Sequence, residues 1–162
     1  MSKKAVIWIS VVLYVLITLA IIGIVIAAVK PQIDKSRDKA AIEQTIVLMQ
    51  NLDEDILRVS ETQGTKLQRN IKLSKGTLTF DNNNNEIYWN LESNYQYSEP
   101  PKSGYPNEIN IGRITAITQE RGDKWDVTLT LTYAFNITFD SKETPKTLTQ
   151  ALPKFQLLPR II

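Results

Sequence analysis

The sequence predicts an α+β fold, in which one long N-terminal helix packs on an antiparallel β-sheet domain. Three observations support this prediction. Residues 5–29 carry no charge, residues 33–61 place apolar side chains at the spacing of an amphipathic helix, and from Lys66 onward apolar and polar residues alternate as they do in strands. Because the chain has 162 residues, the part after the apolar run is large enough for one modest domain.

The apolar run over residues 5–29 is long enough to cross a bilayer, since a spanning helix needs about 20 apolar residues. The run exceeds the apolar region of a cleaved secretory signal peptide, which has about 7 to 15 residues. Within it, Ser10, Tyr14 and Thr18 recur every four residues and share one helix face. We expect each hydroxyl group to bond to a carbonyl one turn back, with helix packing as the alternative.

An amphipathic helix is predicted over residues 31–63. Pro31 removes one helical hydrogen bond and clashes with the carbonyl four residues before it, so we expect a kink or a break near residues 27–30. The apolar stripe that should pack on the domain consists of Ala41, Ile42, Thr45, Ile46, Met49, Leu52, Ile56 and Val59. The acidic run at residues 53–55 is expected on a solvated surface, and Gln63-Gly64 should end the helix.

Residues 76–91 predict a β-hairpin around the asparagine-rich turn at residues 81–85. The apolar residues expected on a shared face are Leu78 and Phe80 in the first strand and Ile87, Trp89 and Leu91 in the second. The turn lacks the regular ligand pattern and the closing Glu of an EF-hand loop. We therefore attribute its asparagines to turn formation rather than to calcium binding.

A long strand is predicted over residues 125–140, because large apolar side chains occupy the odd positions from Trp125 to Phe139 and mainly polar side chains fill the even ones. Such alternation describes a strand with one buried and one wet face. Its expected partner is the segment over residues 108–119, across a tight turn at residues 120–124. Gly112-Arg113 interrupts the alternation of that partner, which predicts a β-bulge there.

Two further segments contain prolines and are expected at the edges of the domain. Residues 95–107 hold three prolines and three tyrosines, which favours a stiffened loop whose tyrosines fold onto the sheet, with a contact surface as the alternative. Residues 148–162 contain Pro153 and Pro159, so they are expected to form an edge strand or a docked tail rather than a central strand.

Composition and motifs argue against several classes of function. Lys3 and Lys4 account for the whole net charge of +2, and the neutral remainder argues against nucleic acid as a partner. The chain has no histidine and no cysteine, and no phosphate-binding or nucleophile-elbow motif. We therefore expect no enzyme, no metal site and no cofactor. Asn136 begins the glycosylation sequon Asn-Ile-Thr on the predicted wet face, where it is either glycosylated or unused.

The N-terminus resembles the class III leader of prepilins, in which a short basic peptide is cut off just before an apolar helix. In that family a basic pair followed by Gly or Ala marks the site, and these positions correspond here to Lys3, Lys4 and Ala5, with Val6 as the first mature residue. Bacterial type IV pilins carry Glu at the fifth mature position, where this chain has Ser10. The chain is therefore most similar to archaeal type IV pilins or pilin-like proteins.

The resemblance implies a structural subunit of a surface filament, with its N-terminus inside the cell. Residues 1–5 are then the leader, 6–30 the transmembrane and filament-core helix, 31–63 the amphipathic helix and 64–162 the antiparallel β domain. The implied partners are the membrane, other copies or other pilins, a prepilin peptidase, a platform protein and a cytoplasmic ATPase.

Such filaments serve adhesion, motility or DNA uptake. We expect the amphipathic helix to be a core helix of its own domain; the alternative is that its outer face also contacts neighbouring subunits in such a filament. The alternative is a minor pilin, or a binding module that stays anchored by one membrane pass and never polymerises. The Lys/Arg distribution around the apolar run does not by itself favour an internal N-terminus, because Lys30, Lys35, Arg37 and Lys39 follow the run.

Overall fold

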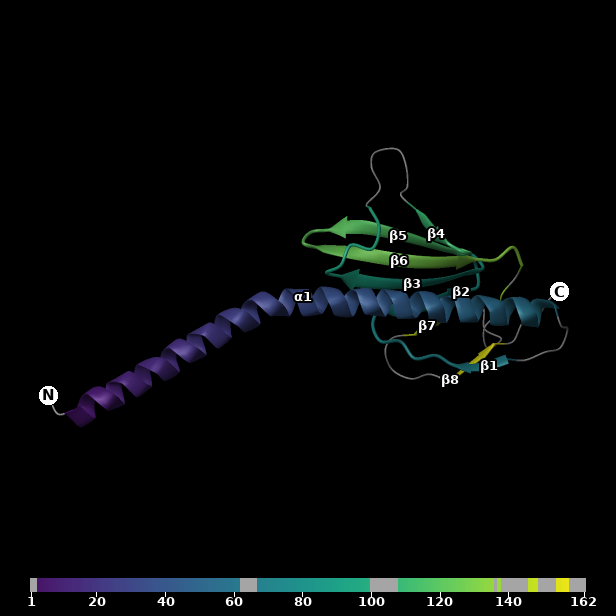
Figure 1. Cartoon of the computed structure of the whole chain (residues 1–162). Coiled ribbons are helices and arrows are strands. Elements are labelled where there is room, and N and C mark those ends of the chain that lie inside the picture. The colour runs from purple at the N-terminus through teal and green to yellow at the C-terminus, as the bar shows by residue number, and fades with distance from the viewer. Residues whose placement is uncertain are drawn as a thin grey trace. The chain divides into compact units, whose positions relative to one another are not determined.

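A computed structural model describes residues 3–61, 67–99, 108–135, 137, 146–148 and 154–157, with side chains described in 8–61, 71–99, 108–135 and 137. Its contacts divide the chain into two compact units, Met1–Ser36 and Arg37–Ile162. One helix, α1 (Lys3–Glu61), begins in the first unit and ends in the second. The described strands all belong to the second unit, so the structure has the predicted α+β arrangement (Figure 1).

Helix α1 continues through Pro31 without interruption. Of the predicted kink or break near residues 27–30, the break is therefore wrong, and the kink stays a prediction. A proline in a helix removes one backbone hydrogen bond, whereas the turns on either side keep theirs. The predicted end at Gln63-Gly64 lies outside the described residues, and the described helix stops at Glu61.

A six-stranded antiparallel sheet with the order β4-β5-β6-β3-β2-β7 forms most of the second unit. Its strands are β2 (Thr77–Asp81), β3 (Glu86–Ser93), β4 (Ile109–Ile111), β5 (Ile114–Arg121), β6 (Lys124–Thr132) and β7 (Lys146–Leu148). A separate two-stranded sheet pairs β1 (Leu67–Asn70) with β8 (Lys154–Leu157). The described part of the C-terminal segment over residues 148–162 forms edge strands, as predicted. Strand β8 pairs with β1 alone, and Leu148 belongs to β7 at an edge of the large sheet.

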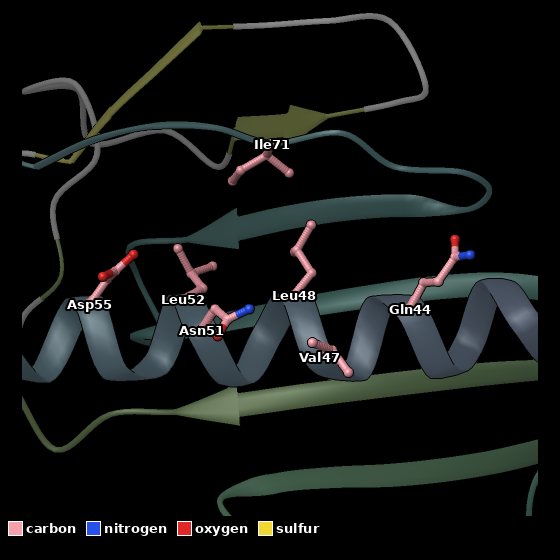
Figure 2. A pocket seen from close by; sticks show the side chains of 7 residues that line it. All are labelled: Gln44, Val47, Leu48, Asn51, Leu52, Asp55 and Ile71. Atoms are coloured by element: carbon pink, nitrogen blue, oxygen red, sulfur yellow. The ribbon is translucent and has the colours of Figure 1, made fainter.

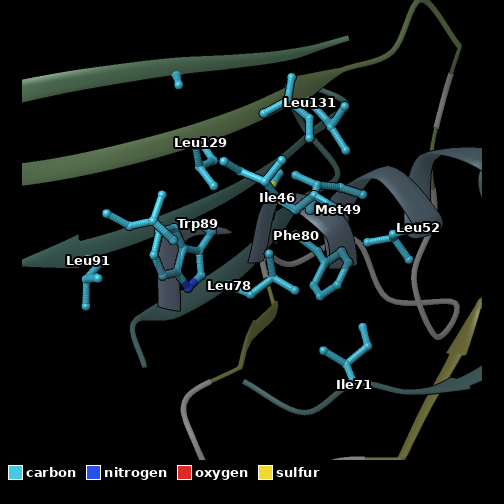
Figure 3. Packing of buried hydrophobic residues seen from close by; sticks show 14 of the residues in the cluster. Ile46, Met49, Leu52, Ile71, Leu78, Phe80, Trp89, Leu91, Leu129 and Leu131 are labelled. Atoms are coloured by element: carbon cyan, nitrogen blue, oxygen red, sulfur yellow. The ribbon is translucent and has the colours of Figure 1, made fainter. Parts of the chain in front are cut away.

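The second half of α1 covers one face of this sheet (Figure 1). Every member of the predicted apolar stripe is buried, from Ala41 to Val59. Figure 3 shows Ile46, Met49 and Leu52 of the helix beside apolar side chains of β2, β3 and β6. Burying a large apolar side chain contributes about 1.5–3 kcal/mol. The packing of the stripe on the sheet is therefore a main source of stability for the unit.

The predicted hairpin is confirmed as β2 and β3, which pair from Thr77 with Asn90 to Asp81 with Glu86. Its turn depends on Asp81, whose Oδ1 accepts hydrogen bonds from the backbone N–H groups of Asn83 at 2.9 Å and Asn84 at 3.4 Å. These bonds support a turn-forming role for the asparagine-rich run.

Glycine is required at position 76, directly before β2. Gly76 has a φ of +78°, and a Cβ atom there would lie 2.5 Å from Nε1 of Trp89. The same indole nitrogen donates a hydrogen bond to the carbonyl of Lys75 at 3.0 Å. The absence of a side chain at Gly76 thus lets the buried Trp89 reach a backbone acceptor.

The predicted long strand is too long, because β6 ends at Thr132. Its pairing partner β3 begins at Glu86, opposite Thr132, and no residue of β3 remains to continue the ladder. The residues that follow β6 bond instead to the turn before β3. Asn85 accepts the N–H of Tyr133 through its carbonyl at 3.0 Å and the N–H of Ile137 through Oδ1 at 3.1 Å.

The predicted partner strand over residues 108–119 is also wrong as a single strand. Gly112 and Arg113 form a tight turn between β4 and β5, and Ile111 pairs with Ile114 across it. Gly112 has a φ of +63°, a conformation that glycine adopts at no steric cost. The change in alternation therefore marks a second hairpin rather than a bulge, and only β5 pairs with β6.

Candidate membrane and assembly surface

The apolar half of α1 is exposed on all sides. Every large apolar side chain from Trp8 to Val29 keeps between 44% and 73% of its surface accessible. The apolar window has a mean hydropathy of 3.0, and none of it is buried. By length and composition, this is the one helix of the described chain that is able to cross a membrane. Large exposed apolar surfaces of this kind mark contacts with lipid or with other protein.

The residues predicted at the leader cleavage site lie at the start of this helix. Lys3, Lys4, Ala5 and Val6 all belong to α1, and their side chains are not among those described. Thr18 Oγ1 donates a hydrogen bond to the carbonyl of Tyr14 at 2.8 Å, as predicted for the hydroxyl groups of this face. Asn136, the predicted glycosylation residue, lies outside the described residues.

Asp38 ties α1 to the β2–β3 hairpin at the start of the second unit. Its carboxylate is 2% exposed and accepts hydrogen bonds from Lys75 Nζ at 2.6 Å and from the backbone and side-chain nitrogens of Asn94 at 2.8 and 3.1 Å. Burial favours a raised pKa, but the hydrogen bonds from Lys75 and Asn94 outweigh it and hold the pKa of Asp38 below its ordinary value. This carboxylate therefore fixes the point at which the helix joins the domain.

The acidic run at residues 53–55 is not the solvated surface that the sequence predicts. Successive helix positions point in different directions, so that Asp53 and Asp55 are buried while Glu54 is exposed. Asp53 Oδ2 lies 3.7 Å from Nε of Arg113, whose guanidinium stacks 5.3 Å from the ring centre of Tyr133. Burial, and then the charge of Asp53, raises the pKa of the Tyr133 phenol. These groups connect the helix to the β4–β5 turn.

A groove of about 280 Å³ runs along α1 in the second unit (Figure 2). The residues that line it are Gln44, Val47, Leu48, Asn51, Leu52 and Asp55 of the helix and Ile71, which follows β1. Val47 is 56% exposed, although it is a large apolar residue. The groove therefore combines an apolar floor with amide and carboxylate groups.

Sequence reasoning missed this groove. The available signal was that Val47 and Leu48 are apolar residues outside the predicted stripe. Ile71, on the other wall, follows a strand of the two-stranded sheet, which the sequence did not predict. The predicted tyrosine contacts are confirmed for Tyr95 and Tyr97, which pack half-buried against the core.

Comparison of the chain with protein-family models, curated proteins and solved structures gave no match. In the part of the chain that the structure describes, no group of three or more His, Cys, Asp or Glu side chains is placed to hold a metal ion. The features that stand out are an exposed apolar helix and a groove on the folded unit.

Proposed function

We propose that this chain is the structural subunit of a type IV pilus-like surface filament. It is inserted in the membrane as a prepilin and polymerises through its N-terminal helix. The observation that carries the proposal is the apolar half of α1, which is uncharged and exposed on every side, and which continues as one helix into a folded α+β unit.

The physical basis is that the helix can leave lipid without losing apolar surroundings. Residues 6–29 have no charge to desolvate, and neighbouring helices offer the same kind of environment as lipid tails. Moving the helix from the bilayer to a filament core therefore costs little. In this proposal a prepilin peptidase removes residues 1–5, and a platform protein with a cytoplasmic ATPase drives assembly.

The position of the mature N-terminus tests the processing step. Mass spectrometry of protein from its native membrane or filament should find a chain that begins at Val6, and Ala5→Trp should leave the leader attached. A conservative change just inside the mature helix, Ile9→Leu, serves as the matched control. Exported protein that keeps Met1 or Ser2 would contradict processing.

Electron microscopy of surface material tests assembly. Filaments should appear under expressing conditions, and immunolabelling of the β domain should decorate them along their length. If the protein is processed or anchored but no filament forms, the single-pass anchored module becomes the better explanation. Labelling confined to a few points on filaments of another protein would indicate a minor pilin.

A further inference from the structure

We infer that the face of the large sheet opposite α1 binds a neutral polysaccharide, which lies across the strands. The binding surface, the outer patch, is formed by side chains of β3, β6 and β5. Its members are Tyr88, Asn90, Thr115, Ile117, Thr128 and Thr130. The inference goes beyond the proposed filament and does not depend on it, because all these residues belong to the second unit.

Strand register places the outer patch in two rows that run across the strands. The rows are Tyr88–Thr130–Thr115 and Asn90–Thr128–Ile117. In each strand these residues alternate with buried ones, so their side chains lie on the face away from the core. All six are exposed or half-buried. Because neighbouring strands lie about 4.8 Å apart, each row is about 10 Å long, which is room for a short stretch of an extended polymer.

The outer patch is uncharged, although charged side chains lie on the same face at both of its ends. Glu86 lies beyond the first row, opposite Thr132. Beyond the second row, Glu92 and Asp126 lie opposite each other, and they form ion pairs with Lys124 and Arg121. A centre without charge and a polar rim are features of binding surfaces. A neutral partner fits this centre, because covering it does not bury an unpaired charge.

The polar groups of the outer patch both donate and accept hydrogen bonds, as the hydroxyl groups of a sugar do. Asn90 Nδ2 donates a hydrogen bond to Thr128 Oγ1 at 3.1 Å. Thr115 Oγ1 donates one to Oδ1 of Asn110, which continues the first row into β4, at 3.3 Å. These bonds orient the side chains, and the amide and hydroxyl groups keep further donor and acceptor sites for a ligand.

Tyr88 and Ile117 supply the apolar part of the outer patch, and both are half-buried. A pyranose ring has a C–H face that is apolar and hydroxyl groups around its rim. Tyrosine combines an apolar ring with a polar tip in the same way. A sugar ring can therefore cover the apolar surface while its hydroxyl groups bond to the amide and threonine side chains. The centre of a protein–protein interface is richer in apolar and aromatic side chains than this surface, so a polysaccharide fits it better.

Co-sedimentation of the full chain with particles of cellulose, chitin or mannan tests the inference. The protein is kept in a detergent without a sugar headgroup, and the bound fraction gives an apparent Kd for each neutral polymer. At least one polymer should bind the protein. Binding should persist in about 1 M sodium chloride, where the Debye length is only about 3 Å, because no charge holds the ligand. Absence of binding to all three polymers, or loss of binding in salt, would overturn the inference.

Two matched amide-to-carboxylate changes test whether the outer patch is the binding surface. Asn90→Asp places a charge in the uncharged centre with almost the same side-chain shape, and it should weaken binding several-fold. Gln119→Glu makes the same chemical change on the same face but in the charged rim, opposite Asp126, and it should leave binding unchanged. Equal effects of the two changes would place the ligand elsewhere and overturn the inference.

Truncation of Tyr88 tests the apolar contact. Tyr88→Ala should weaken binding by about tenfold or more, because aromatic side chains at the centre of an interface dominate its binding energy. Tyr88→Phe keeps the ring and should bind nearly as well as the unaltered protein. Circular dichroism checks that both variants are folded. Unchanged binding by folded Tyr88→Ala would overturn the inference.

Electron microscopy of the same variants separates this inference from the proposed function. Asn90→Asp should form filaments as the unaltered protein does. Loss of filaments in this variant, with no polysaccharide bound by the unaltered protein, would show that a second copy covers the outer patch, and would overturn the inference. Polysaccharide binding by unaltered protein that never forms filaments would refute the proposed function alone.

Discussion

The two halves of α1 belong to one helix but bury their apolar side chains in opposite ways. From Trp8 to Val29 every large apolar side chain is exposed, and these side chains surround the helix. Between Ala41 and Val59 most of them belong to the predicted stripe, whose members are all at least nine-tenths buried, whereas Val47, outside the stripe, is exposed. The comparison shows that apolar content alone does not decide where a helix lies. The distribution of apolar side chains around the helix decides whether the chain itself or another molecule covers it.

The two halves of α1 also differ in the kind of polar side chain that they carry. The polar side-chain groups of the apolar half are uncharged, namely the indole N–H of Trp8 and hydroxyl groups, and Thr18 satisfies its own hydroxyl by bonding to the preceding turn. The amphipathic half buries carboxylates, and Asp38 accepts hydrogen bonds from Lys75 and Asn94 of the hairpin region. A buried charge needs such partners. The amphipathic half is therefore committed to one domain, whereas the apolar half carries no charge that needs a partner.

The largest expected effect on filament formation comes from placing a charge in the apolar half of α1. Ile17→Asp or Ile21→Asp should abolish filaments, because an unpaired charge in an apolar helix bundle costs several kcal/mol. Electron microscopy of surface material measures the effect. The β domain should stay folded, since both positions lie in the first unit.

Ile17→Leu is the matched control, because it keeps the site apolar at nearly the same volume. Circular dichroism of the aspartate variants should show unchanged β structure. Abundant filaments with Asp at position 17 would contradict a core role for this half of the helix.

The second prediction compares two apolar residues of the amphipathic half. Ile42 is fully buried and Val47 is 56% exposed. Ile42→Ala should lower the free energy of unfolding by about 2–5 kcal/mol, since it opens a cavity in the core. Val47→Ala should change it by less than about 0.5 kcal/mol. Chemical denaturation of a fragment that starts at Ile33 measures both effects, and we expect that fragment to be soluble and folded.

Comparable losses for the two variants would show that the groove residue belongs to the core. Aggregation of the unaltered fragment would show that the folded unit needs residues before Ile33.

The sequence predicted the helix faces and the first hairpin well, since periodicity reports directly which side chains share a face. It failed locally at Pro31 and at the Gly112-Arg113 turn, and it also failed where a long-range partner decides the outcome. The strand from Trp125 ends at Thr132 because β3 begins opposite it, and Asp53 is buried because Arg113, distant in sequence, lies beside it. The groove was missed for the same reason. Its wall at Ile71 follows a strand whose partner, β8, comes from the end of the chain.

The third prediction concerns the anchor at Asp38. Asp38→Asn should lower the free energy of unfolding by about 2 kcal/mol at neutral pH, because hydrogen bonds to a charged group are lost. The pKa of Asp38 in the folded protein lies below its ordinary value of 3.8. Its contribution is therefore complete above that value, and it is lost as the pH falls below that value and through the lower pKa of the folded protein.

Denaturation at several pH values between neutral and 3 measures this dependence. The variant should differ most from the unaltered protein at neutral pH, and the difference should shrink below about pH 4. Asp34→Asn, one turn earlier and in the first unit, is the matched control and should keep the acid dependence. A constant difference at all pH values would show that Asp38 acts through packing rather than charge.

The smallest expected effect is on the face of the sheet opposite α1. Thr130 lies in β6 with its side chain half-buried, and its neighbours Leu129 and Leu131 point into the core. Thr130→Ser removes one methyl group from the polar face, so the free energy of unfolding should change by less than about 0.5 kcal/mol. Leu129→Ala, one position away, should cost about 2–5 kcal/mol because it empties a fully buried site. Denaturation curves of the two variants should therefore separate clearly. Similar denaturation curves for the two variants would mean that Thr130 is packed as tightly as Leu129. Both faces of the sheet would then be covered, and not only the face that packs on α1.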